Sequence, residues 1–125
     1  MHRKYAGTGA FVMLAAVALG AFGAHVLEPQ IGEKAIGTFE TGVHYHMIHG
    51  IGMLLAAFAS GLGGDRRRLL WANRLFLLGI ILFSGSLYLL AVTGWKWFGP
   101  ITPLGGVSFI AGWLMFALAM LRKDN

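Results

Sequence analysis

The sequence predicts an all-α membrane protein, a single domain (1–125) of four transmembrane helices in an antiparallel up-down bundle. Hydrophobic residues make up 57% of the 125 residues and charged residues only 12%, about half the charged share of an ordinary soluble domain. Apolar runs recur at the length of roughly 20 residues that crosses a bilayer. Basic residues flank these runs, which indicates membrane topology and argues against a nucleic-acid partner.

The expected spans are residues 6–27, 42–62, 72–93 and 101–121. The first follows Arg3 and Lys4 and is similar to a cleavable signal peptide, but its apolar length favours an uncleaved span. Pro29 is expected to end this helix. Thr102 and Pro103 are expected to serve as the N-cap and the first residue of the fourth helix.

The lysines and arginines predict the orientation of the bundle, because such residues concentrate in short cytoplasmic loops. Eight of the ten lie at the termini, between the second and third spans or, for Arg74, at the start of the third span: Arg3, Lys4, Arg66, Arg67, Arg68, Arg74, Arg122 and Lys123. Lys34 and Lys96 lie in the other two loops. We therefore expect both termini in the cytoplasm.

The second span has one small, polar face and one bulky, apolar face when projected at about 100° per residue. The first face comprises Gly42, His46, His49, Met53, Ala56 and Ser60, and the second comprises Met47, Ile51, Leu55, Phe58 and Leu62. In water the bulky face would point to a core. In lipid it should meet acyl chains, and the small face should meet neighbouring helices.

Small residues on the other spans predict further helix contacts. The first span aligns Gly9, Ala16, Gly20 and Ala24; the third aligns Ile81, Gly85, Tyr88 and Val92; the fourth aligns Gly105, Ser108, Gly112 and Ala119. Such faces also suit packing against a second copy or another membrane protein. The expected partners are therefore the lipid bilayer and a homo-oligomer or another membrane protein.

Several short motifs together are similar to the YwdK/YgdD family of small bacterial membrane proteins. These motifs are Gly20-Ala-Phe-Gly-Ala-His25, Tyr45 with His49, Phe83-Ser-Gly-Ser-Leu-Tyr88, Thr102-Pro-Leu-Gly-Gly106 and Gly112-Trp113. They occur in the family's order over nearly the whole chain. The resemblance implies a four-span fold and a multi-pass location in the inner membrane. It implies no reaction, because the family carries a label of unknown function.

The candidate polar cluster comprises His25, Tyr45, His46, His49, Ser84, Ser86 and Tyr88. We expect His49 to form a hydrogen bond to Ser84, Ser86 or Tyr88 and so join helices. As alternatives, His46 and His49 could line a path for a solute or proton, or share a metal ion. Glu40 and His44 could likewise bind a divalent cation at the membrane surface. The sequence favours the packing role, and we predict no metal and no cofactor.

No catalytic group can be named. The chain has no cysteine and no phosphate-binding or dinucleotide-binding motif. Ser84 has no base in its own helix, and the first span lacks the acidic residue on which small multidrug exporters depend. We therefore predict a non-enzymatic structural or accessory membrane component. The alternative is a protein that handles a small solute, an ion or a lipid through the polar cluster.

Overall fold

The fold was analysed in a computed structural model that describes residues 1–122, where every regular element is helical. The elements are α1 (Arg3–Phe22), the π-helix η1 (Gly23–Leu27), α2 (Glu28–Ala59), α3 (Arg66–Gly79), the π-helix η2 (Ile80–Ser84), α4 (Gly85–Thr93), the 3₁₀-helix η3 (Lys96–Ile101) and α5 (Thr102–Leu121). Three continuous helical stretches are long and apolar enough to cross a membrane: Arg3–Ala59, Arg66–Thr93 and Lys96–Leu121.

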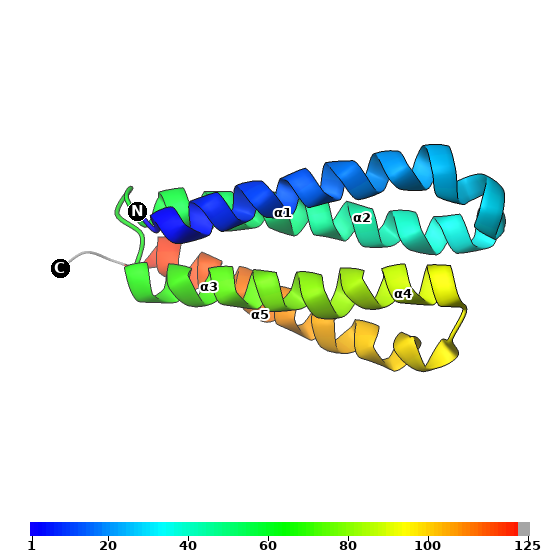
Figure 1. The fold of residues 1–125 in the computed structure, drawn as a ribbon. Coiled ribbons are helices and arrows are strands. Elements are labelled where there is room, and N and C mark those ends of the chain that lie inside the picture. Colours follow the sequence, from blue (N-terminus) through cyan, green and yellow to red (C-terminus); the bar gives the residue numbers. More distant parts are fainter. Residues whose placement is uncertain (123–125) are drawn as a thin grey trace.

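The first of these stretches folds back on itself. Its 57 residues would measure roughly 85 Å as one straight helix, against about 30 Å of hydrocarbon. Gly32 breaks it with φ 84° and ψ 172°, a conformation that glycine adopts readily. A Cβ atom at Gly9 would lie 3.3 Å from Met53, and one at Gly23 would lie 2.7 Å from Phe39, so α1 and η1 lie beside α2 and run in the opposite direction (Figure 1).

The prediction that Pro29 ends the first helix is wrong. Pro29 is the second residue of α2, which follows η1 without a break, so its missing N–H removes one hydrogen bond but does not end the helical stretch. The helical backbone continues until Gly32, which makes the turn. The span that was expected to close at residue 27 is therefore followed by one more helical turn before the chain reverses.

The second half of the chain forms a matching pair of helices. α3, η2 and α4 follow one another without a break, Gly94 ends α4 with φ 73°, and α5 returns along α3 (Figure 1). Asp65 caps α3 by accepting hydrogen bonds from the amides of Arg67 and Arg68. Thr102 is not the N-cap of α5, contrary to expectation, because η3 continues directly into that helix.

The two predicted faces of the second span are confirmed. Its small and polar residues are all buried, namely Gly42, His46, His49, Met53, Ala56 and Ser60. On the other face, Ile51, Leu55 and Phe58 are 46%, 52% and 51% exposed. A water-soluble bundle would bury these large side chains. Their exposure is therefore the arrangement expected of a helix that meets lipid on one side and protein on the other.

The predicted faces of the first and third spans are wrong in part, where the chain forms π-helices, although Gly9 and Ala16 are buried as expected. A π-turn adds a residue to each turn and rotates the following side chains around the axis. Ala24 is exposed, and Gly23 and Leu27 are buried in its place. Ile81 and Val92 are 60% and 55% exposed. The packed face of the third stretch instead carries Ile80, Ser84 and Ala91.

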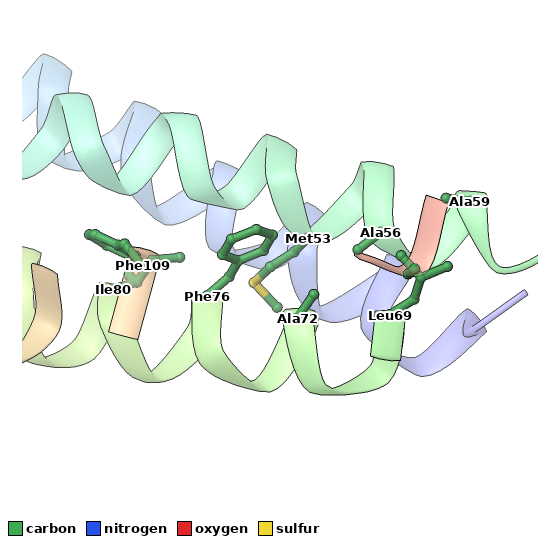
Figure 2. Packing of buried hydrophobic residues seen from close by; sticks show 9 residues of the cluster. Met53, Ala56, Ala59, Leu69, Ala72, Phe76, Ile80 and Phe109 are labelled. Carbon is green, nitrogen blue, oxygen red and sulfur yellow. The ribbon is translucent and has the colours of Figure 1, made fainter. Parts of the chain in front are cut away.

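Two apolar clusters fill the bundle. The larger one joins α2, α3, η2 and α5 toward the end that carries the N-terminus, and it includes Met53, Ala56, Ala59, Leu69, Ala72, Phe76, Ile80, Phe109 and Ala119 (Figure 2). The smaller one, nearer the opposite end, comprises Leu27, Ile36, Phe39, Val43 and Ala91. Because acyl chains are as apolar as these side chains, shape complementarity and hydrogen bonds hold the helices together more than burial itself does.

Candidate functional site

The polar side chains between the two clusters form hydrogen bonds that join different helices. His46 on α2 is hydrogen-bonded through Nδ1 to the hydroxyl of Tyr88 on α4, at 2.8 Å. His46 is buried, and Tyr88 is partly buried beside it. The ring of Tyr88 also packs on Phe39 at a centroid distance of 4.9 Å. This pair therefore fastens α4 to α2 near the smaller apolar cluster.

His49 makes two hydrogen bonds that define its tautomer. The indole Nε1 of Trp113 on α5 donates to His49 Nε2 at 3.0 Å, so Nε2 is unprotonated, because an indole N–H can only donate. His49 Nδ1 lies 2.7 Å from the carbonyl oxygen of Tyr45, which can only accept. The ring is therefore a neutral imidazole with its proton on Nδ1, and both of its nitrogens are occupied.

Aromatic rings enclose the same histidine. Its ring stacks on Phe109 with centroids 3.5 Å apart and planes 9° apart, and Phe76 approaches edge-on at 5.6 Å. The partners of His49 are therefore not those predicted, since Ser84, Ser86 and Tyr88 all bond elsewhere. α5 lies close enough for Trp113 to reach the His49 ring. A projection of the second span alone could not indicate this, because it does not place the neighbouring helices.

The serines tie helices together through backbone carbonyls. The Ser84 hydroxyl donates to the carbonyl of Gly42 at 2.7 Å, and Ser108 donates to the carbonyl of Leu75 at 2.7 Å. Ser86 donates to its own helix and lies 2.6 Å from the hydroxyl of Thr102 on α5. These three serines therefore link neighbouring helices through hydrogen bonds. Within residues 1–122, none of their hydrogen bonds is to a side chain that could act as a base.

Two members of the predicted cluster differ from the prediction. His25 lies in η1 and is exposed, so it is not part of the cluster, contrary to prediction. Tyr45 is 40% exposed and contributes its ring, which lies 4.6 Å from that of Phe83. Its backbone carbonyl, and not its hydroxyl, is the group that contacts His49.

Most residues predicted to pack helices make close contacts. A Cβ atom at Gly42 would lie 2.8 Å from the ring of Tyr88, one at Gly112 would lie 2.7 Å from Phe76, and one at Gly105 would overlap the backbone of Phe83. Gly20 is looser, with Val43 at 3.3 Å. Gly85 and Ala24 are wrong as packing residues. The nearest atom to a Cβ at Gly85 would be the carbonyl oxygen of Ile80 at 4.0 Å, so no other helix approaches it closely.

A lateral groove runs beside His49 between α2 and α5. Its volume is about 450 Å³, and its lining includes Tyr45, Ile48, His49, Phe83, Gly106, Phe109, Ile110 and Trp113. Ile110 is 71% exposed, so the groove opens toward the surroundings of the bundle. It is chiefly apolar and aromatic, and neither ring nitrogen of the histidine is left without a partner.

Sequence reasoning missed two residues of this region. Trp113 was noted only for its family resemblance, although an indole opposite a histidine is a natural hydrogen-bond donor. Asn73 is fully buried on α3, and its Oδ1 atom has no hydrogen-bond partner. An asparagine inside the apolar run of the third span could have been recognised in the sequence as a candidate buried polar group. Among residues 1–122, no group of three His, Asp or Glu side chains is placed to share a metal ion.

Comparison with known proteins identifies relatives over most of the chain. The family model described as "Protein of unknown function (DUF423)" matches residues 19–106. The UPF0382 membrane protein YwdK of Bacillus subtilis is 48% identical over 118 residues, which cover 91% of this chain and 93% of that protein. The UPF0382 inner membrane protein YgdD of Escherichia coli K12 is 41% identical, covering 85% and 80% of the two chains. No solved structure matches the chain.

Proposed function

Because the chain belongs to the DUF423 family of UPF0382 membrane proteins, we propose that it is a four-span, non-enzymatic structural or accessory component of the inner membrane. That the chain is an integral inner-membrane protein follows from its relatives and its apolar helices. The following observations support the number of spans, their orientation and the accessory role.

Four spans with both termini in the cytoplasm fit the folding of the chain and its charges. The stretch Arg3–Ala59 doubles back at Gly32, so it supplies two crossings. The N-terminus and the end of α5 lie at the same end of the bundle (Figure 1). That end also carries Arg66, Arg67 and Arg68, and a concentration of arginines favours the cytoplasmic side.

Cysteine labelling tests this topology, since the natural chain contains no cysteine. We expect a Leu62→Cys variant to react with a membrane-impermeant maleimide only in inside-out vesicles. A Glu33→Cys variant should react only in right-side-out vesicles. Both residues are exposed. Leu62 is the last residue of the second expected span and lies in the turn after α2, which ends at Ala59, and Glu33 lies between the first two expected spans. Labelling of both positions from the same side would contradict the proposed arrangement.

The hydrogen-bonding capacity of the His49 ring is fully used inside the protein, and this observation favours the accessory role. Both ring nitrogens bond to the protein itself, one to Trp113 and one to the carbonyl of Tyr45, and Phe109 covers one ring face. A proton carrier or metal ligand needs a free nitrogen. Protonation of Nε2 would also place two N–H groups against each other at Trp113. The histidine therefore acts as a packing group between α2 and α5.

The test compares His49→Ala with His44→Ala. Loss of the His49 ring leaves the indole N–H of Trp113 unpaired and opens a cavity, so unfolding in detergent should become easier by about 2–3 kcal/mol. His44 is one turn away on the same helix and is exposed, so its replacement should have little effect. Proteoliposomes with wild-type protein should show the same proton and potassium flux as empty vesicles.

The groove beside His49 gives the alternative function its support, because its volume of about 450 Å³ lies in the range of small-molecule sites. If the protein handles a solute or ion there, reconstituted wild-type protein should raise flux above that of empty vesicles. His49→Ala should then abolish the flux while the helices stay folded. That result would overturn the accessory role and establish the alternative.

A further inference from the structure

The end of the bundle that carries the N-terminus contains a groove between α3 and α5 that the proposed function does not use. Its volume is about 700 Å³, and its lining includes Asp65, Arg67, Arg68, Trp71, Met115 and Arg122. We name it the arginine groove. It differs from the groove beside His49 in having a cationic mouth formed by three guanidinium groups.

The arginine groove has a surplus of positive charge within the described part of the chain. Asp65 is its one carboxylate there, and it already accepts hydrogen bonds from two backbone amides. Arg122 lies 3.3 Å from it and Arg68 lies 3.8 Å from it. One negative charge therefore balances three positive ones in part, which leaves an excess of two that suits an anion.

The depth of the lining residues gives the groove an amphipathic character. Trp71 lies about one turn deeper along α3 than Arg67 and Arg68, and Met115 lies about two turns deeper along α5 than Arg122. Trp71 is 44% exposed. The guanidinium group of Arg74 lies over the Trp71 ring, 4.9 Å from its centroid. Tryptophan and arginine together mark the headgroup level of a bilayer. A ligand seated here meets cations at its polar end and apolar side chains along its length.

We propose that the arginine groove binds an anionic phospholipid, with the phosphodiester headgroup at the guanidinium groups and an acyl chain alongside Met115 and Trp71. Guanidinium groups bind phosphate oxygens in pairs with strong, directional hydrogen bonds. Basic pockets between membrane helices commonly hold anionic lipid headgroups. This proposal goes beyond the accessory role and needs only that the chain lies in a bilayer.

Replacing Arg67 distinguishes a specific site from a diffuse basic surface. This residue is exposed and has no ion pair recorded within residues 1–122, so its side chain is not needed for packing. Arg66 is its neighbour, carries the same charge and is also exposed, but it does not line the groove. Arg67→Gln and Arg66→Gln therefore change the net charge equally and differ only in position.

The experiment titrates purified full-length protein in dodecyl maltoside with dioctanoyl phosphatidylglycerol and follows the midpoint of thermal unfolding. A ligand that binds the folded state raises this midpoint in a saturable way. We expect phosphatidylglycerol to do so, and dioctanoyl phosphatidylcholine and inorganic phosphate to leave the midpoint unchanged. Arg67→Gln should weaken the apparent affinity about fivefold, the effect of one arginine at a membrane surface.

Arg66→Gln is the matched control and should leave the affinity for phosphatidylglycerol close to that of the wild type. Equal weakening by both variants would show a diffuse basic surface and overturn the site. Equal stabilisation by phosphatidylcholine, or by inorganic phosphate alone, would also overturn it, since the first needs no anion and the second needs no lipid. The unfolding midpoints without lipid should match among the three proteins, because neither side chain packs inside the bundle.

Discussion

The continuous stretch α3–η2–α4 packs against α5 on one side and against α2 on the other, and the two interfaces are built differently. On the α5 side the closest approaches are of glycines on aromatic residues, with Gly105 on Phe83 and Gly112 on Phe76, and the hydrogen bonds of Ser108 and Ser86 add to them. On the α2 side, hydrogen bonds cross the interface, from Ser84 to the carbonyl of Gly42 and between His46 and Tyr88.

The two interfaces illustrate two ways in which helices associate in a bilayer, where hydrophobic burial contributes little. The α5 interface depends on close approach, so it should be damaged mainly by added atoms. The α2 interface depends on polar groups that would otherwise lie unpaired in hydrocarbon, so it should be damaged mainly by removed atoms. Both interfaces use small residues, since Gly42 lies against the Tyr88 ring on the α2 side, but Gly105 on the α5 side lies against backbone.

Gly105→Ala should have the largest effect. The added Cβ would overlap the backbone of Phe83, which cannot move aside as a flexible side chain can, so α5 must separate from η2. We expect a loss of about 3 kcal/mol or more, at the upper end of overpacking effects. Unfolding by SDS of protein in mixed micelles measures this loss.

Gly106→Ala is the matched control for that variant. The nearest atom to its added Cβ would be a ring carbon of Phe83 at 3.9 Å, an ordinary contact. Alanine is also the better helix former, by up to about 1 kcal/mol. Equal destabilisation by the two alanines would show that close approach at Gly105 does not carry the α5 interface.

Tyr88→Phe should have an intermediate effect, because it removes the hydroxyl that bonds His46 and keeps the ring that fills the space beside Gly42. We expect a loss of about 1 kcal/mol, the value of an interhelical hydrogen bond in a membrane protein. Tyr45→Phe serves as the control, since no hydrogen bond is recorded for that hydroxyl in residues 1–122. If Tyr88→Phe proves as stable as the wild type, shape alone carries the α2 interface as well.

Acidification should have the smallest effect, and it should act at the α5 interface. Asp65 closes the end of this interface, where its amide donates to the carbonyl of Ala119 and its carboxylate meets Arg122. Burial acts to raise the pKa of Asp65, but the amides of Arg68 and Arg67 and the nearby guanidinium charges together hold it below its ordinary value of 3.8.

Because the folded state lowers this pKa, the carboxylate stabilises the protein fully above the ordinary value. The contribution is lost as the pH falls through the lowered pKa of the folded state. Unfolding midpoints measured from pH 6 down to about 2.5 should therefore fall more steeply for the wild type than for Asp65→Asn over the range below about pH 4. Parallel curves for the two proteins would show that the carboxylate does not clamp α3 to α5.

Some of this architecture could be predicted from the sequence because it depends on one helix at a time. The projection of the second span correctly placed Met53 and Ala56 on the buried face and Ile51 on the exposed face. The same method failed at Ala24 and Gly85. A π-turn precedes or contains each of these positions, and no residue pattern in the chain announced those turns. Regular periodicity is informative only while the helix keeps one geometry.

The candidate site was less predictable, since its hydrogen bonds connect residues far apart in the chain. The sequence indicated that His46 and His49 face inward, but it assigned His49 to the serines or to Tyr88. In the structure His49 accepts its bond from Trp113, and Tyr88 bonds His46. Asn73 was overlooked although an amide in an apolar run is itself a signal, and its complete burial could be known only from the packed bundle.

Composition and charge pattern by themselves determined that this chain belongs in a bilayer and which face of the second span meets other helices. These properties follow from solvation, which acts on each residue wherever its partners lie. Only the tertiary structure decided which partners meet: Gly32 as the point of reversal, Phe83 against Gly105, and Trp113 on His49. Those contacts depend on helix phase and on the separation between helices, and both are fixed only when the whole bundle packs.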